Sequence, residues 1–403
     1  MTGGAPRPLS GIKVLDFGHT IMGPCAGLLL ADLGADVIKV EPKDGDATRR
    51  LPGFAAGFFA AYNRNKRSIA VDLKRPEGQA ALRRLAESAD VLVENFAPGT
   101  IERLGCGWAE LQRVNPRLIY LSLKGYLAGP YAERGALDEV VQMQTGLAYM
   151  TGPPGKPLRM GAPIIDILGA VFGIVAVLAA LREREQTGHG QRVGSALFES
   201  AAFLVGTHIA GCAVTGRPMP PMPARKGAWG VYDVFTSSDQ QQVFVAVTSD
   251  GHWQRFCDKF GFEDLGADQR LATNAARCVA REWLIPELAR RLARVCLRTI
   301  LADCEAAKVP CARVNRPDDL CSDPHLLAGG ALLATALSAF GGGPLVGLPA
   351  LPLEFGERRG RPEIVRQPPR VGEHGSHVLS EAGFSATEIE DLLALGVLGQ
   401  QTA

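Results

Sequence analysis

The sequence GIKVLDFGHTIMGPCAGLLLADLGADVIKVE, residues 11–41, decides the fold of this chain. Its opening run, GIKVLDF, is short and apolar and predicts a buried β-strand, and the helical pattern CAGLLLADLG follows Gly23 and Pro24. Residues 35–41, ADVIKVE, predict a second strand. Strands separated by a helix pair in parallel through a crossover connection, so this stretch predicts the first unit of an α/β domain.

The alternation of strand and helix patterns continues to residue 123. Residues 76–88 predict an amphipathic helix with a proline in its first turn, and residues 90–94 and 118–123 predict further strands. The expected fold class is therefore α/β, with a doubly wound, Rossmann-like large domain built on a parallel sheet.

Two breaks divide the rest of the chain. The tract RPMPPMPAR at residues 217–225 can be neither a helix nor a central strand, and GGGPLVGLP at residues 341–349 is the second break. Between them, VYDVF and QVFVAV predict a β-hairpin, and helical patterns follow from about residue 252 to residue 306. A smaller α+β domain is therefore expected between the breaks, with short strands and a final helix at residues 386–395 after them.

The composition excludes several classes of protein. With 43 basic and 42 acidic residues the net charge is +1, which argues against a protein that binds along nucleic acid. The nine cysteines form no C-x-x-C pair and the seven histidines show no zinc-ligand spacing, so no metal site is expected. The N-terminal residues lack the apolar segment of a secretory signal. We expect a cytoplasmic protein with reduced cysteines.

Residues 162–181, APIIDILGAVFGIVAVLAAL, are about long enough to cross a bilayer. Pro163, Gly169 and Gly173 interrupt this stretch and charged residues follow it, so we expect a helix in a soluble core and no membrane partner. Asp166 is the only charged residue in the stretch. Its carboxylate is expected either to cap the helix by accepting first-turn N–H groups or to act as a nucleophile or acid–base group in an apolar pocket.

Several common catalytic motifs do not occur. The turn at residues 18–24 does not match G-x-G-x-x-G, and the chain contains neither a Walker A motif nor a G-x-S-x-G elbow. Two segments remain as candidate binding sites. NRNKRSIAVDLK at residues 63–74 is either a solvated basic edge or an anion pocket. VENFAPG at residues 93–99 is either a turn with a packed phenylalanine or part of a ligand site at the carboxyl end of a strand.

Eight motifs occur in an order that resembles one known family. They are GIKVLDF, LGADVIKVE, NRNKRSIAVDLK, VENFAPGTIERLG, LKGYLAGP, LDEVVQMQTGLAYMTG, GAPIIDILGA and TGHGQRV. Together they resemble the class III CoA-transferases over nearly the whole chain, most densely from residue 11 to residue 198. Each motif is weak alone, but the ordered set is highly specific.

The resemblance implies an enzyme that moves CoA from an acyl-CoA donor to a free carboxylic acid, with no permanently bound cofactor. The family's nucleophile falls on Asp166, which would attack the donor thioester to form a mixed anhydride and would then carry CoA as an aspartyl thioester. An apolar pocket fits this chemistry because it excludes the water that would hydrolyse the intermediates. The resemblance also implies a homodimer of interlocked subunits.

The family's CoA contacts fall on a set of residues from the first part of the chain. They are Ile21, Met22, Lys43, Val71, Asp72, Leu73, Lys74, Asn95, Phe96, Ala97, Arg103, Leu137 and Asp138. By this resemblance the backbone at Ile21 and Met22 would contact CoA, and Lys43 would approach the nucleotide phosphates, although a relative has arginine one place earlier. We expect residues 1–216 and 330–403 to form the large CoA-binding domain and residues 217–329 the small one.

Two rival functions are considered. The α-methylacyl-CoA racemases are similar in fold, but their catalytic histidine falls at Leu137, and leucine cannot relay a proton. The other rival is a catalytically silent CoA-binding or structural protein, against which Asp166 together with the basic CoA segments argues. The expected acceptor is a small dicarboxylate such as succinate, itaconate or malate, because Arg225 and Lys226 lie beside the presumed pocket. The alternative for these two residues is a merely solvated charge pair.

Overall fold

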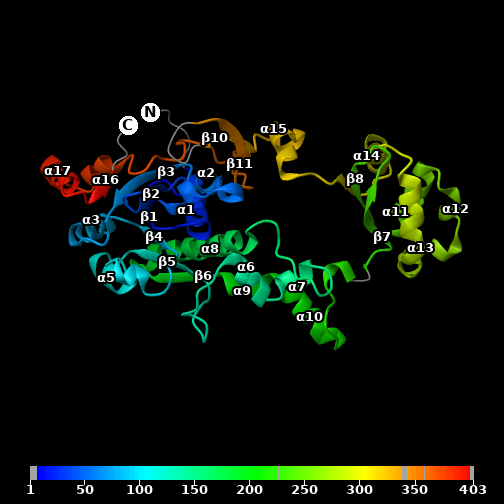
Figure 1. Ribbon diagram of the computed structural model, residues 1–403, viewed down its shortest axis with the longest axis horizontal. Helices are drawn as coiled ribbons and strands as arrows, with labels where there is room; N and C mark the ends of the chain where they lie inside the picture. The colour runs from blue at the N-terminus through cyan, green and yellow to red at the C-terminus, as the bar shows by residue number, and fades with distance from the viewer. Residues whose placement is uncertain (1–6, 225–226, 338–342, 358, 400–403) are drawn as a thin grey trace. The chain divides into compact units, whose positions relative to one another are not determined.

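The computed structural model describes residues 7–224, 227–337, 343–357 and 359–399. The chain forms two compact units (Figure 1). The large unit combines Met1–Pro223 with Pro324–Ala403, and the small unit is Ala224–Asp323. The boundaries expected from the sequence, at residues 217 and 329, lie near these positions.

A seven-stranded sheet forms the centre of the large unit, in the order β12-β3-β2-β1-β4-β5-β6. The strands are β1 (Lys13–Asp16), β2 (Asp36–Glu41), β3 (Lys66–Val71), β4 (Val91–Glu94), β5 (Ile119–Lys124), β6 (Arg192–Ala196) and β12 (Leu398–Gly399). Strands β1 to β6 pair in parallel, as expected, because helices connect them. The C-terminal strand β12 adds an antiparallel edge beside β3, which the sequence did not predict.

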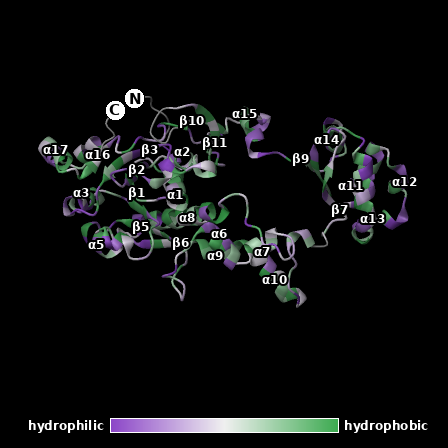
Figure 2. Cartoon of the chain, in the orientation of Figure 1, coloured by the Kyte–Doolittle hydropathy of each residue, from purple (hydrophilic) through white to green (hydrophobic). Residues whose placement is uncertain are grey.

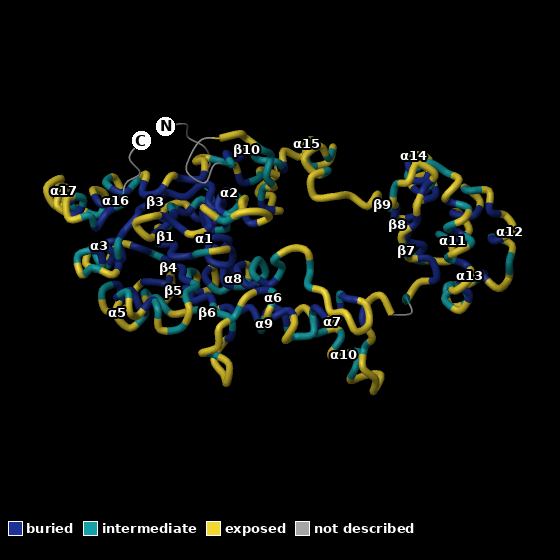
Figure 3. The backbone as a smooth tube through the Cα atoms, in the orientation of Figure 1, coloured by how far each residue is buried: buried dark blue, intermediate teal, exposed yellow. Residues whose placement is uncertain are grey.

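Helices cover both faces of this sheet, and its central strands are buried (Figure 3). The helices of the first part are α1 (Met22–Asp32), α2 (Phe58–Tyr62), α3 (Pro76–Ala86), α4 (Thr100–Arg103), α5 (Trp108–Val114), α6 (Asp138–Gln144), α7 (Leu147–Thr151), α8 (Ile164–Thr187), α9 (Leu197–Leu204) and α10 (Gly206–Thr215). After the small unit come α15 (Pro324–Ala328), the antiparallel pair β10 (Leu332–Ala336) and β11 (Leu345–Pro349), α16 (Gly375–Glu381) and α17 (Ala386–Ala394). Apolar side chains of α1, α8 and α9 form the core on one face, and those of α3, α5, α16 and α17 form the core on the other. This is the doubly wound arrangement that the sequence predicted.

Helix α8 contains the long apolar stretch and is among the hydrophobic elements of the large unit (Figure 2). By length and composition it could cross a membrane, as could α9 and α10 if that bent pair is one span. It packs against α1, β5, β6 and α9, but only 39% of its most apolar window is buried. Val171, Val175 and Leu178 are exposed. The prediction of a helix buried in the core is therefore wrong for one side of α8, because the described residues pack against its other side only.

The small unit packs helices on an antiparallel sheet. Its strands are β7 (Val231–Thr236), β8 (Gln242–Val247) and β9 (Cys311–Arg313), and its helices are α11 (Asp250–Phe260), α12 (Glu263–Gly266), α13 (Asn274–Leu292) and α14 (Leu297–Ala306). Inward-facing residues of the strands, such as Val231, Phe235 and Val243, share one core with Trp253 and Leu284 of the helices. The predicted hairpin and the helices that follow it are confirmed.

Candidate functional site

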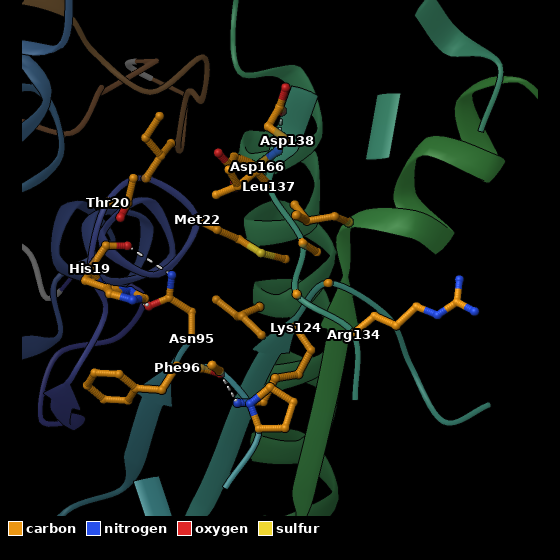
Figure 4. Close-up of a pocket in the computed structure, with 18 of the residues that line it drawn as sticks. His19, Thr20, Met22, Asn95, Phe96, Lys124, Arg134, Leu137, Asp138 and Asp166 are labelled. Atoms are coloured by element: carbon orange, nitrogen blue, oxygen red, sulfur yellow. Dashed lines mark hydrogen bonds between the residues drawn. The ribbon is translucent and has the colours of Figure 1, made fainter. Parts of the chain in front are cut away.

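A cavity of about 270 Å³ opens where β1, β4 and β5 end at their carboxyl termini (Figure 4). It is lined by residues 19–22, 95–98, 123–125, 132, 134–138, 166 and 197. In open α/β sheets, ligands bind at this edge because the loops that follow the strands converge there. Figure 4 shows Asp138 and Asp166 close together on one side of the cavity, with Phe96 and Lys124 farther along it.

The turn from β1 into α1 forms one wall of the cavity. A Cβ atom at Gly18 would collide with the backbone of Gly23, and a Cβ at Gly23 would collide with Gly18, so only glycine permits the two ends of the turn to touch. Thr20 lies between them in the left-handed region, with φ of 64°. Asn95, which follows β4, accepts hydrogen bonds from the backbone N–H of His19 at 2.9 Å. The turn is therefore fastened to the neighbouring strand.

Two buried lysines donate hydrogen bonds to backbone carbonyls of the same turn. The Nζ of Lys39 donates to the carbonyl of Gly18 at 2.8 Å and pairs with the Asp46 carboxylate at 2.9 Å. The Nζ of Lys66 donates to the carbonyl of Pro24 at 2.9 Å and pairs with Asp16 at 2.7 Å. Charged donors make strong hydrogen bonds in a water-poor interior, so these lysines fix the shape of the turn.

Both interpretations of the basic segment at residues 63–74 are wrong for three of its four basic residues. Arg64 is buried and pairs with Asp32 at 2.7 Å, Lys66 is buried with Asp16, and Arg67 pairs with Asp36 and Glu381. A charge is stable in the interior only when it is paired, so these side chains are neither a solvated edge nor free to bind an anion. Of the four, only Lys74 is exposed.

Asp138, the first residue of α6, caps the start of α8. One oxygen of its carboxylate accepts hydrogen bonds from the N–H groups of Ile165 at 3.1 Å and Asp166 at 3.2 Å. The other oxygen accepts a hydrogen bond from the side-chain amide of Gln142, whose own oxygen accepts from the N–H of Met160 at 3.0 Å. The free N–H groups at the start of α8 are therefore satisfied from another helix.

This arrangement leaves the carboxylate of Asp166 free. Among the described residues no hydrogen bond reaches its side-chain oxygens, and the side chain lines the cavity (Figure 4). The capping role considered for Asp166 belongs to Asp138 instead. Burial, followed by the negative charges of Asp138 and Glu139, raises the pKa of Asp166 to about 7. A carboxylate that is short of partners and more basic than usual is a typical nucleophile or proton acceptor.

Lys124 extends from the end of β5 into the cavity wall. Its Nζ donates to the carboxylate of Glu94 at 2.7 Å and to the carbonyl of Phe96 at 2.7 Å. Glu94 also accepts from the hydroxyl of Ser122 at 2.6 Å and from the N–H of Phe96 at 3.0 Å. Because its charge is neutralised by Glu94, Lys124 fixes the loop after β4 and is a weak candidate for binding a free anion.

The cavity brings together eight of the residues expected from the sequence. They are Ile21, Met22, Asn95, Phe96, Ala97, Leu137, Asp138 and Asp166. The remaining six, Lys43, Val71, Asp72, Leu73, Lys74 and Arg103, lie outside the cavity lining. Val71 and Leu73 are buried in the apolar core, whereas Lys43, Lys74 and Arg103 are exposed near the carboxyl ends of β2, β3 and β4. Contact of any of these residues with CoA stays a prediction.

His19 and Lys124 are among the cavity residues that were not expected from the sequence. Both lie at the carboxyl end of a predicted strand, and that position was the signal that could have identified them. Arg225 and Lys226, considered as acceptor-binding residues, lie outside the described residues. Within the described part of the chain, no group of three or more histidine, cysteine, aspartate or glutamate side chains is placed to hold a metal ion.

Comparison with known proteins identifies the family of the chain and supports its fold. The model of CoA-transferase family III matches residues 9–375, and the chain belongs to this family. It is 34% identical to a succinate–glutarate CoA-transferase of Agrobacterium fabrum, over 93% of this chain and 95% of that protein. It is also 34% identical to a succinyl-CoA:mesaconate CoA-transferase of Haloarcula hispanica, over 93% of this chain and 96% of that protein.

A solved structure supports the same assignment. The crystal structure of a CaiB/BaiF family protein from Brucella suis superposes with a TM-score of 0.83 at 31% identity, covering 94% of this chain and all of that one. The chain is therefore an enzyme, a CoA-transferase whose substrates are CoA thioesters. The sequence-based recognition of the family is confirmed.

Proposed function

We propose that this enzyme transfers CoA from an acyl-CoA donor to a small dicarboxylic acid, with Asp166 as the nucleophile. The observation that carries the proposal is the free carboxylate of Asp166 in the cavity at the carboxyl edge of the sheet. Its pKa of about 7, raised by burial and by Asp138 and Glu139, makes it a stronger nucleophile than an ordinary carboxylate, while part of it is ionised at neutral pH.

The proposed steps balance without an added proton donor. An oxygen of Asp166 attacks the thioester carbonyl, the C–S bond breaks, and CoA leaves as a thiolate, which gives a mixed anhydride. The thiolate then attacks the Asp166 carbonyl and expels the donor acid as a carboxylate. The acceptor carboxylate next attacks the aspartyl thioester and releases thiolate again. Attack of this thiolate on the acceptor carbonyl yields the new acyl-CoA and restores the Asp166 carboxylate.

The residues around the cavity support these reaction steps by fixing the position of Asp166. Asp138 binds the N–H of Asp166 itself and of the residue before it, so the backbone that carries the nucleophile is fixed. Gln142 in turn fixes Asp138. Positioning a nucleophile against a bound thioester removes much of the entropic barrier to attack.

Three exposed cations support the expected place of the CoA nucleotide. Lys43, Lys74 and Arg103 follow β2, β3 and β4, at the same edge of the sheet as the cavity. Arg103 is held by a hydrogen bond to the hydroxyl of Thr100 at 2.8 Å. Arginine and lysine recognise phosphate groups, so we propose that these side chains bind the phosphates while the thioester enters the cavity.

The acceptor is proposed from the relatives. The Agrobacterium protein is named for succinate and glutarate, and the Haloarcula protein is named for succinyl-CoA and mesaconate. Succinate, glutarate and mesaconate are all dicarboxylic acids. Recognition of the second carboxylate by Arg225 or Lys226 stays a proposal.

We also propose a cytoplasmic homodimer with interlocked subunits. Exposed apolar side chains continue from α8 onto α9 and α10, at Phe203, Ile209 and Val214, and a second copy of the chain would cover them. The charged residues at the end of α8 argue against a bilayer as the cover. Light scattering should give twice the chain mass of 42.8 kDa; a monomer, or pelleting with lipid vesicles, would contradict the proposal.

Incubation with succinyl-CoA and a panel of mono- and dicarboxylic acids tests the proposed reaction, with the CoA esters read by mass spectrometry. We expect transfer to dicarboxylates, its loss in Asp166→Asn, and normal transfer in the control Asp391→Asn, whose carboxylate is exposed on α17. No transfer to any acid, together with racemisation of a 2-methylacyl-CoA, would replace the proposal by the racemase function. Normal transfer by Asp166→Asn would refute the mechanism.

A further inference from the structure

His19 presents an unused functional group to the cavity. It follows β1, lines the cavity, and its ring lies 5.2 Å from the ring of Phe96, centroid to centroid. Figure 4 shows the imidazole beside Asn95, on the side of the cavity formed by the β1–α1 turn. The proposed transfer mechanism gives this side chain no role.

The hydrogen bonds of Asn95 determine which ring nitrogen carries the proton. The Nδ2 of Asn95 donates to the carbonyl of His19 at 2.9 Å, so this end of the side chain must be the amide nitrogen. The oxygen Oδ1 therefore lies at the other end, where it accepts from the backbone N–H of His19 at 2.9 Å and lies 2.8 Å from Nδ1. An oxygen can only accept, so Nδ1 carries the proton and Nε2 carries a lone pair.

Burial keeps the imidazole ring of His19 neutral. Burial is the main cause that lowers the pKa of His19, and Lys39 and Lys124 lower it further, whereas Asp46 and Asp16 raise it. The net change is downward from 6.5. At neutral pH the ring is therefore uncharged, and Nε2 is a hydrogen-bond acceptor. Among the described residues no donor reaches Nε2.

A neutral acceptor discriminates among the groups of the substrates. Carboxylates and the thioester group offer only lone pairs, so neither binds favourably to Nε2. The CoA arm carries N–H donors in secondary amides, and the first of these lies two carbons from the thioester sulfur. Asp166 and His19 line the same cavity, so a thioester in contact with Asp166 brings this amide, rather than the more distant ones, into the cavity with His19.

We propose that His19, with its tautomer fixed by Asn95, binds the acyl-CoA arm by accepting a hydrogen bond at Nε2 from the amide N–H nearest the thioester. This inference rests on the proposed use of the cavity for acyl-CoA. His19 is a substrate-binding residue in this account, and Asn95 is the positioning residue that keeps Nε2 unprotonated. The contact holds the thioester at a fixed distance from Asp166.

A pair of short thioesters tests the contact. One is the succinyl thioester of N-acetylcysteamine, which keeps the amide, and the other is its ester isostere, in which oxygen replaces only the N–H. We expect His19→Leu to lower kcat/KM about five- to tenfold for the amide substrate, mainly through KM, as befits the loss of one neutral hydrogen bond. The same variant should leave the ester substrate unchanged. His19→Gln, which keeps an acceptor, should recover part of the loss, and His189→Leu, in an exposed loop, is the matched control.

Histidine ¹⁵N NMR with CoA alone reads the same contact without turnover. The Nε2 resonance of His19, assigned by its absence in His19→Gln, should lie in the unprotonated range and move when CoA is added. The response should persist in Asp166→Asn, which abolishes transfer, so failure of the binding role and failure of the proposed reaction are distinguishable. An equal loss with both thioesters, or an Nε2 resonance that CoA does not move, would overturn the inference.

Discussion

Asp166→Asn should make the enzyme more stable as well as inactive, and the gain should depend on pH. The pKa of Asp166 in the folded protein is about 7, against an ordinary 3.8, because the carboxylate is largely buried near Asp138 and Glu139. Ionisation of Asp166 is therefore less favourable in the folded state than in the unfolded state, and above the unfolded pKa this difference destabilises the fold. Asparagine has a similar shape and no charge, so the substitution removes this cost.

The magnitude follows from the two pKa values. They differ by about three pH units, and each unit corresponds to about 1.4 kcal/mol. The carboxylate is not fully buried, and residual access of water reduces the effect, so we expect a gain of about 2 to 4 kcal/mol. The raised pKa also fixes the sign of the dependence. Below about pH 4 both states bind the proton and the variant gains nothing. The gain grows as the pH rises from about 4 to 7 and is constant above it.

Urea denaturation of the two proteins between pH 4.5 and pH 8.5 measures this difference. Asp391→Asn, at an exposed position, is the control: the difference between its free energy of unfolding and that of the wild type should not change with pH. A free energy of unfolding for Asp166→Asn that is no larger than that of the wild type at pH 8 would refute the reasoning. A difference in free energy of unfolding that is the same at every pH would also refute the reasoning, because such a difference would not arise from ionisation of Asp166.

Three more predictions concern the site and its supports. In initial-rate assays kcat/KM should rise through a midpoint near pH 7 on the acid side, because Asp166 must lose its proton to attack; a profile flat from pH 5.5 to 8.5 would contradict this. Lys66→Met should lower the free energy of unfolding in urea by about 3–5 kcal/mol, because it leaves the buried Asp16 without its cationic partner. Adding Asp16→Leu should restore much of the loss; equal losses in the single and double variants would argue against the pair. Gly169→Ala would place a methyl group against the end of the Met22 side chain, so we expect the free energy of unfolding to fall by about 1–3 kcal/mol. Calorimetry measures this loss, and an unchanged unfolding transition would show that the contact is loose.

The sequence predicted strands β1, β2, β4 and β5 because each is a short apolar run next to a helical pattern, whereas it did not predict β6 or β12. Asp166 stood out because it is a lone carboxylate in an apolar helix. Both signals are local, and both agree with the structure. The family resemblance added the chemistry, which local patterns alone left open between a cap and a nucleophile.

What the sequence could not supply depends on contacts between distant residues. The sequence indicated a basic surface at Arg64 and Lys66 because their acidic partners lie far earlier in the chain. These partners are Asp32 on α1 and Asp16 on β1. Likewise, the capping of α8 by Asp138 crosses from α6. The role of His19 depends on a hydrogen bond to Asn95, which follows β4, and no spacing rule links these two positions.

Trapping the intermediate shows whether Asp166 carries the transferred CoA. The enzyme is mixed with succinyl-CoA in the absence of acceptor, treated with hydroxylamine, digested and analysed by mass spectrometry. We expect a hydroxamate on the peptide that contains Asp166, dependent on succinyl-CoA and absent when free acceptor acid is added in excess before hydroxylamine. An unmodified Asp166 in an enzyme that is active in transfer, or a hydroxamate on another carboxylate, would contradict it.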